Sequence, residues 1–350
     1  MTNKYKYDRI TLLLLLFGLP FFSCNDNKST RTIEPSFYYW KSVFKLNAYE
    51  KQRMNALQVQ TLYIKYFDVD WNDITKTPVP VAPLRSTGDS LQNNIAVIPV
   101  VFITNGCIQK IDSSQVDKLA ADIMGLIKKI TVDNNFRDAN KEIQIDCDWT
   151  AATKEKYFKL LQAIKQQVGT TLLSATIRLH QVKFCSQTGI PPIDKGLLMC
   201  YNMGNLKDPS IKNSILETGE LNKYIGKLST YTLPLDVALP LFDWKVLFRR
   251  NVYTGLIQNL PTSVFTNDFS VKKDNRIDIL KDTLLQGYDL KKGDLIRVEE
   301  SGYNEIISAA ASVNAKLKNT HARVAIYHLD SVLLNKYTLH ELEGIYNSMR

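Results

Sequence analysis

Two aspartates one residue apart mark the stretch of this sequence that could carry chemistry. Asp146 and Asp148 lie in the run of residues 142–150, where polar and apolar side chains alternate as they do in a strand. Because alternate side chains of a strand share a face, both carboxylates point to the same side. Two acids this close raise the pKa of one of them, which can then supply a proton near neutral pH. The alternative is that a neighbouring strand or Arg178 simply holds these carboxylates and rigidifies the rim.

A second pair of acids has the same spacing. Asp68 and Asp70 end the predicted strand of residues 61–71, and with the first pair they could surround one opening. Carboxylate oxygens of this kind bind Ca²⁺, but a solvated rim is the more ordinary explanation, so we predict no metal site. Arg178 and His180 share one face at the end of another predicted strand, and we expect them to contribute to ligand binding.

Tryptophans follow several of the predicted strands. Four of them lie at or just beyond strand ends, and an indole face is a surface on which a sugar ring can stack. Packing inside the protein would explain the same positions. We select Trp71 and Trp149 as candidate ligand-binding residues; the other two are Trp40 and Trp244.

The segments that must position these side chains alternate between strand and helix patterns. Residues 150–168, for example, repeat apolar side chains at helical spacing between threonines that can cap a helix and Gly169, which can end one. Such alternation favours parallel pairing, and parallel sheets build their ligand sites at the carboxyl ends of the strands. The predicted strands cover residues 36–44, 61–71, 95–103, 142–149, 171–180, 196–203, 231–239 and 322–328.

Eight strands separated mostly by helices predict one α/β domain, a (β/α)₈ TIM-type barrel over residues 36–350. Residues 245–320 are more polar and more interrupted, so we interpret them as an insertion before the last strand and a possible subdomain. A doubly wound open sheet is the alternative architecture. It fits less well because the sequence has no glycine-rich phosphate loop.

The N-terminus has the pattern of an exported lipoprotein. A basic start leads into an apolar run that is too short to span a bilayer comfortably and that ends at Cys24. This ending resembles a bacterial lipobox, which implies a signal peptide over residues 1–23 and acyl chains such as palmitate on Cys24. Residues 24–35 would form a tether. We expect a protein anchored to the cell envelope at the outer membrane; an ordinary secretory signal is the alternative.

Composition excludes several functions. The 350 residues carry a formal net charge of +9, but Lys and Arg are scattered without a dense basic run, so we predict no nucleic-acid binding. The cysteines beyond Cys24 lack the spacing of a zinc site, and we expect them to be buried free thiols. No Gly-x-Ser-x-Gly motif argues for acyl transfer. We predict no cofactor, and the sequence does not predict an oligomeric state.

Three short motifs resemble the chitinase-type family 18 glycoside hydrolases. That family's fourth strand carries the pattern Asp-x-x-Asp-x-Asp-x-Glu, and here Asp146, Asp148 and Trp149 occupy matching places. Its sixth strand commonly reads Met-x-Tyr-Asn, matched by residues 199–202, and its seventh strand end is approximated by residues 237–242. The resemblance covers about half of the chain and implies the same barrel.

The resemblance also assigns roles to individual residues. In the family's mechanism, the aspartate that matches Asp148 supports the acetamido group of the substrate as that group attacks the sugar carbon, and the tyrosine that matches Tyr201 hydrogen-bonds it. Asn202 completes the motif. The general acid of the family is replaced here by Thr150, and the first aspartate by Ile143. A threonine cannot deliver a proton to the leaving oxygen, so hydrolysis of the family type is not expected.

These observations lead to three hypotheses. The first is a cell-envelope lipoprotein whose barrel binds a glycan, such as a peptidoglycan-like saccharide, at its C-terminal mouth. The second is an active glycoside hydrolase whose acid comes from another strand, with Asp70 or Asp243 as the replacement. The third is a structural or assembly lipoprotein of the outer membrane that uses the barrel as a scaffold.

Overall fold

The computed structural model describes residues 31–350 except 89–90, 92–93, 137–138, 140 and 259. The predicted signal peptide, Cys24 and the first residues of the tether lie outside the described residues. In the described part, no helix is both long enough and apolar enough to cross a bilayer.

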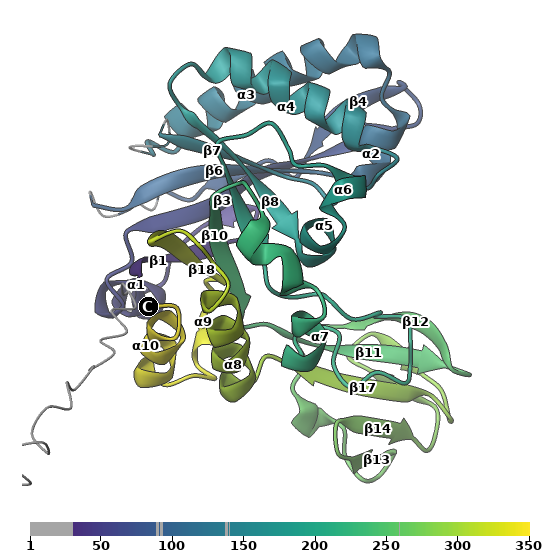
Figure 1. The fold of residues 1–350 in the computed structure, drawn as a ribbon. Helices are drawn as coiled ribbons and strands as arrows, with labels where there is room; N and C mark the ends of the chain where they lie inside the picture. Colours follow the sequence, from purple (N-terminus) through teal and green to yellow (C-terminus); the bar gives the residue numbers. More distant parts are fainter. Residues whose placement is uncertain (1–30, 89–90, 92–93, 137–138, 140, 259) are drawn as a thin grey trace, which may run out of the picture. The chain divides into compact units, whose positions relative to one another are not determined.

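Eight parallel strands form a closed ring (Figure 1). The ring closes because β1 pairs with both the last strand and β3. This confirms the predicted α/β fold, the (β/α)₈ barrel. One further strand, β4 (Thr77–Val81), pairs antiparallel with β3 outside the ring. The ring consists of β1 (Thr32–Tyr39), β3 (Thr61–Asn72), β6 (Ala96–Ile103), β7 (Glu142–Asp146), β8 (Leu172–Arg178), β9 (Lys195–Met199), β10 (Leu235–Pro240) and β18 (His321–Tyr327).

Helices cover the outside of the ring and follow from apolar side chains at helical spacing. In α4 (Lys154–Val168) the buried residues recur on one face, and Gly169 ends the helix with a positive φ of 60°. Helix α3 lies beside α4 over β6 and β7 (Figure 1). The other helices are α1 (Ala48–Ala56), α2 (Asn105–Lys110), α3 (Val116–Asp133), α5 (Leu179–Lys183), α6 (Cys185–Thr188), α7 (Thr218–Asn222), α8 (Tyr303–Asn314), α9 (Ser331–Leu334) and α10 (Leu339–Asn347), with short 3₁₀ turns η1 (Ser113–Gln115), η2 (Ile225–Thr230) and η3 (Thr262–Val264).

Several predicted boundaries need correction. β1 begins at Thr32, so residues 32–35, which we assigned to the tether, belong to the barrel. β8 ends at Arg178, so His180 lies on α5 and not on a strand. The first predicted strand divides into β1 and β2 (Val43–Phe44), and β2 pairs with β5 (Arg85–Ser86) away from the ring.

The insertion before β18 is a separate layer with its own core. It spans residues 243–300, shorter than the predicted 245–320 at its C-terminal end, because α8 packs back onto the barrel core. Its main sheet is antiparallel in the order β12-β11-β17-β14-β13 (Figure 1). β15 and β16 pair with each other as a hairpin. The strands are β11 (Asp243–Arg249), β12 (Val252–Ile257), β13 (Ser270–Lys273), β14 (Arg276–Ile279), β15 (Thr283–Leu285), β16 (Tyr288–Leu290) and β17 (Leu295–Glu300).

A network of charged side chains fills the ring near the N-terminal ends of the strands. The guanidinium of Arg323 on β18 lies 2.9 Å from the Glu34 carboxylate, 2.8 Å from that of Glu142 and 3.6 Å from that of Asp236. Lys195 on β9 adds a second cation at 2.5 Å from Asp236. These acids come from β1, β7 and β10, so the network ties opposite walls of the ring together.

An extra residue in β3 changes which side chains enter the ring. The register of β3 against β6 shifts between Lys65 and Phe67, which is a β-bulge. Tyr66 contacts Thr131 on α3 and lies outside the ring. Beyond the bulge the alternation is reversed, so Asp68 faces inward.

Candidate functional site

Asp146 is the most buried acid at the C-terminal end of the ring. Its side chain accepts a hydrogen bond of 2.6 Å from the hydroxyl of Thr176 on the neighbouring strand, and the residue is 6% exposed. Burial, followed by the nearby charge of Asp148, raises the pKa of Asp146 to about 7 against the opposing effects of Thr176 and Arg178. The carboxyl group can therefore hold or release a proton near neutral pH.

Asp148 forms a two-pronged ion pair with Arg178. The Nε of Arg178 lies 2.8 Å from Oδ1 of Asp148, and Nη2 lies 3.2 Å from Oδ2. The Asp148 side chain is 45% exposed, whereas that of Arg178 is 20% exposed. Both predicted carboxylates thus have a partner on β8. This is the arrangement expected if neighbouring side chains hold the carboxylates and rigidify the rim. Asp148 still presents part of its side chain to solvent at the mouth.

The third acid of the site is Asp68, which the bulge in β3 turns inward. Its Oδ2 lies 2.9 Å from Lys65, and its Oδ1 is buried without a hydrogen-bond partner among the described residues. Asp68 is close enough to Asp146 to raise the pKa of that carboxyl group. The sequence showed the acid pair at 68 and 70 but not the bulge, which depends on pairing with β6.

The two replacement acids that we named from the sequence are engaged elsewhere. Asp70 is exposed and accepts a hydrogen bond of 2.7 Å from Thr104. Asp243 begins the inserted sheet and pairs with Lys336 at 2.7 Å. Both carboxylates are thus engaged by other side chains, and among the described residues no hydrogen bond links either of them to Asp146 or Asp148.

Tyr201 follows β9 and faces the same space. Its hydroxyl is buried and has no hydrogen-bond partner within the part of the chain that the structure describes. The residue is 3% exposed, and burial raises its pKa well above the usual range, as do the charges of Tyr327 and Asp146, whereas Arg178 opposes the rise. A neutral phenol that lacks a partner is a ready hydrogen-bond donor. Asn202 is exposed beside it in a left-handed turn (φ 55°), which asparagine tolerates.

His180 stands near the ion pair, on α5. Burial lowers the pKa of His180, and the charge of Arg178 lowers it further, while Asp148 acts in the opposite direction. The imidazole is therefore neutral at neutral pH, and either ring nitrogen can serve a ligand as donor or acceptor.

Of the two tryptophans that we selected from the sequence, Trp149 is not placed for ligand stacking. Trp149 is fully buried, stacks on Tyr157 with ring centroids 5.2 Å apart, and donates from Nε1 to the carbonyl of Thr188 at 3.0 Å. That prediction is wrong, because the residue after Asp148 turns back into the helical layer. Trp71 packs partly buried against the core, and strand alternation puts it on the face opposite Asp70.

The aromatic lining of the mouth comes instead from a group of rings of which only Tyr201 was selected from the sequence. Tyr327, at the end of β18, is the centre of this cluster, with ring centroids 5.5 to 5.8 Å from four neighbours. All members except Tyr38 and Tyr201 are partly exposed. Side chains alternate along the last strand, so Tyr327 shares a face with Arg323. This alternation could have identified Tyr327 from the sequence. We call this group the aromatic cluster; it consists of Tyr38, Trp40, Tyr201, Phe242 and Tyr327, with Phe102 in contact with Trp40.

Thr150, which the sequence resemblance matches to the family's general acid, hydrogen-bonds another threonine in this structure. Its hydroxyl lies 3.4 Å from that of Thr153, and its backbone N–H donates to the same Thr153 oxygen at 2.9 Å. Among the described residues no carboxylate hydrogen-bonds Thr150. The backbone carbonyl of Thr150 accepts a hydrogen bond from the N–H of Lys154, the first residue of α4.

The described residues contain no group of three or more His, Cys, Asp or Glu side chains that could hold a metal ion. Four cysteines in this part of the chain are free thiols, of which Cys107, Cys147 and Cys200 are buried and Cys185 is partly exposed. Burial raises the pKa of Cys107 to about 12, so this thiol is a poor nucleophile.

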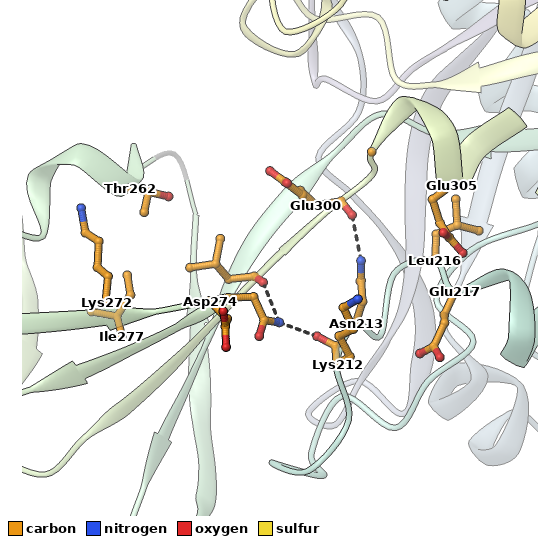
Figure 2. A pocket seen from close by; sticks show the side chains of 13 residues that line it. Lys212, Asn213, Leu216, Glu217, Thr262, Lys272, Asp274, Ile277, Glu300 and Glu305 are labelled. Atoms are coloured by element: carbon orange, nitrogen blue, oxygen red, sulfur yellow. Dashed lines mark hydrogen bonds between the residues drawn. The ribbon is translucent and has the colours of Figure 1, made fainter. Parts of the chain in front are cut away.

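A cavity of about 530 Å³ lies elsewhere, against the inserted sheet (Figure 2). Amides of Asn213 and Asn275 cross it to backbone carbonyls of residues 300, 212 and 298. Its charged side chains have mixed signs, and Glu305 is already bound to the backbone of Thr218. None of the predicted site residues lines it. We place the candidate site at the barrel mouth, where coupled acids and unpartnered buried groups converge.

Comparison with known proteins agrees with the fold. No family model matches the chain, and no curated protein matches it. Solved structures do. The spore cortex-lytic enzyme SleL of Bacillus megaterium is 15% identical, with 92% of this chain and 75% of that chain covered and a TM-score of 0.52. SleL of Bacillus cereus is 11% identical over 92% and 75%, with a TM-score of 0.50.

A chitinase from Chromobacterium violaceum is 10% identical, with 90% of this chain and 99% of that chain covered and a TM-score of 0.50. The fold is thus that of the chitinase-type barrels, as the sequence resemblance implied. Identities this low establish the fold alone, so the function has to be argued from the site.

Proposed function

We propose that the protein binds a glycan at the C-terminal mouth of its barrel and does not hydrolyse it by the family mechanism. The observation that carries this proposal is the buried hydroxyl of Tyr201, which has no partner among the described residues and lies close enough to Asp146 for that charge to raise its pKa. A buried hydroxyl without a partner costs free energy unless a ligand or water uses it.

The chemistry of the mouth suits a saccharide. Partly exposed rings of Trp40, Phe102 and Tyr327 offer apolar faces, and sugar rings stack on such faces through their C–H groups. Beside them Asp148, Arg178 and His180 supply acceptors and donors that can fix the hydroxyl and amide groups of the ligand. Apolar surface with a few oriented polar groups is the usual composition of a small-ligand site.

The proposed lack of hydrolysis rests on Thr150. Glycosidic cleavage of the family type needs a carboxylic acid beside the leaving oxygen, and the residue at that position has only a hydroxyl that lies next to Thr153. The alternative, an active hydrolase, is supported by the pKa of Asp146, which is raised to about 7 by burial and by Asp148. Product analysis separates the two.

The binding test is calorimetric titration with N-acetylglucosamine oligomers and with soluble peptidoglycan fragments, followed by analysis for released products. We expect binding without product release. Asp148→Ala should weaken binding about tenfold or more, because it removes a charged acceptor and frees Arg178 to move. Asp243→Ala is the matched control and should bind as the wild type does, since Asp243 is held by Lys336. Absence of binding to every saccharide by wild-type protein would refute the proposal, and released product would establish the hydrolase.

We further propose that acyl chains on Cys24 hold the protein on the cell envelope, at the outer membrane. The support is the sequence pattern alone, a basic start and an apolar run that ends at this cysteine. Labelling with a radioactive or clickable palmitate should mark the wild-type protein and not Cys24→Ser. Equal labelling of both would rule out this anchor.

A further inference from the structure

Arg178 has more hydrogen-bond donors than its carboxylate partner accepts. A guanidinium carries five N–H groups, and Asp148 takes one from Nε and one from Nη2. Nη1 makes a weak contact of 3.8 Å with the sulfur of Met199. Among the described residues no other oxygen accepts from this guanidinium. At least one N–H on each terminal nitrogen is therefore left for a ligand at the mouth.

The unpartnered hydroxyl belongs to Tyr201, which follows the strand that pairs with the strand of Arg178. Arg178 on β8 and Met199 on β9 are register partners, and Tyr201 follows Met199 by two residues on the same face. The charge of Arg178 is felt at the Tyr201 hydroxyl, where it opposes the rise in pKa that burial causes. Two kinds of donor, one of them cationic, thus converge on one place.

The charged side chains around Arg178 and Tyr201 do not repel an anionic ligand. Lys65 offsets Asp68 at 2.9 Å, and Arg178 offsets Asp148 at 2.8 Å. Asp146 carries only part of a negative charge near pH 7, because burial and Asp148 raise its pKa to about 7. The donors of Arg178 and Tyr201 therefore lie in a part of the mouth whose net charge is small. Two parallel N–H groups of a guanidinium match the two oxygens of a carboxylate.

We infer that the glycan bound here carries a carboxylate, which accepts hydrogen bonds from Arg178 and Tyr201. The inference rests on the proposed glycan binding and names the class of saccharide. Two sources share this chemistry: uronic acid residues, and amino sugars that bear a lactyl ether, as in peptidoglycan strands.

The test compares each acidic saccharide with its own carboxyl amide, which keeps the rings and removes only the charge. Titration calorimetry uses the purified protein with a lactyl-ether amino-sugar oligomer, an oligouronate and the amide of each. We expect at least one acid to bind roughly tenfold or more tightly than its amide, and the saccharide that shows the preference identifies the source. Equal binding of acids and amides would overturn this inference and leave glycan binding intact. No binding by any of the four would overturn both.

Substitutions of Arg178 and Tyr201 test whether these two donors cause the preference for the acid over its amide. Arg178→Gln should bring the acid to within about twofold of its amide, because the cationic donor that distinguishes the charged ligand from the neutral one is gone. Lys110→Met is the matched control; it removes an exposed cation on α2, after a neighbouring strand end, and should keep the preference. If Arg178→Gln fails to fold by circular dichroism, Tyr201→Phe, which removes only the hydroxyl, should lower the preference. Retention of the full preference in the folded variant would refute the assignment.

Discussion

Asp146 should make the stability of the protein depend on pH. Its pKa in the folded protein is raised from the ordinary value of 3.8 to about 7 by burial and by Asp148. The folded state then binds a proton more tightly than the unfolded chain, so this contribution to stability is complete below about pH 4 and is lost as the pH rises through about 7. The difference in pKa corresponds to about 4 kcal/mol at most.

Asp146→Asn removes this dependence, because an amide resembles the protonated acid at every pH. We expect the free energy of unfolding of Asp146→Asn, relative to wild type, to increase between pH 4 and pH 8. Urea unfolding followed by circular dichroism at several pH values measures it. A difference that stays constant over this range would show that Asp146 is not the group responsible.

Among the elements, the inserted sheet depends on a buried ion pair. On β17, Nε of Arg297 lies 2.5 Å from Oε1 of Glu299, and both side chains are fully buried. Glu299 also accepts from Trp244 on β11 and from Ser214, while Arg297 donates to the carbonyl of Leu206. These contacts join the sheet to the loop between β9 and α7, whose first residues belong to the barrel mouth.

Glu299→Ala should therefore lower the free energy of unfolding by about 3 to 5 kcal/mol, because it leaves the Arg297 charge buried without its partner. Glu300→Ala changes the adjacent, exposed glutamate on the same strand and should have an effect within about 0.5 kcal/mol. Urea unfolding of both variants gives the comparison. Similar effects of the two substitutions would mean that the buried pair does not stabilise the sheet.

For the whole molecule, Arg323 connects walls of the ring that are distant in sequence. Its guanidinium forms ion pairs with Glu34 on β1 and Glu142 on β7, and it lies near Asp236 on β10. Burial alone would lower the pKa of Arg323, but the surrounding acids and Tyr63 raise it, so the charge is retained. Arg323→Met leaves the three acids with only Lys195 as a nearby cation. We therefore expect the free energy of unfolding, measured with urea, to fall by about 3 to 5 kcal/mol.

The exposed Lys118→Met on α3 is the matched control and should be nearly neutral. The loss in Arg323→Met should shrink at acidic pH, where protonated acids no longer need a cation. A variant as stable as the control at neutral pH would show that the network does not contribute to closure of the ring.

The sequence by itself determined the alternation of strands and helices, the number of strands in the ring, the place of the insertion and the shared face of Asp146 and Asp148. These features are encoded by local periodicity, which survives whatever the strand later pairs with. Gly169 is an example, since a helix end is set by residues close in sequence.

Only the tertiary structure decided which side chains meet at the mouth. The bulge that turns Asp68 inward depends on pairing between β3 and β6, and the ion pair that holds Asp148 depends on the side chain of the next strand. Trp149 is buried because α4 and α6 close over it, and the aromatic cluster joins residues from the first and last strands. Such contacts are set by closure of the ring, a property of no single segment, so periodicity in the sequence could not reveal them.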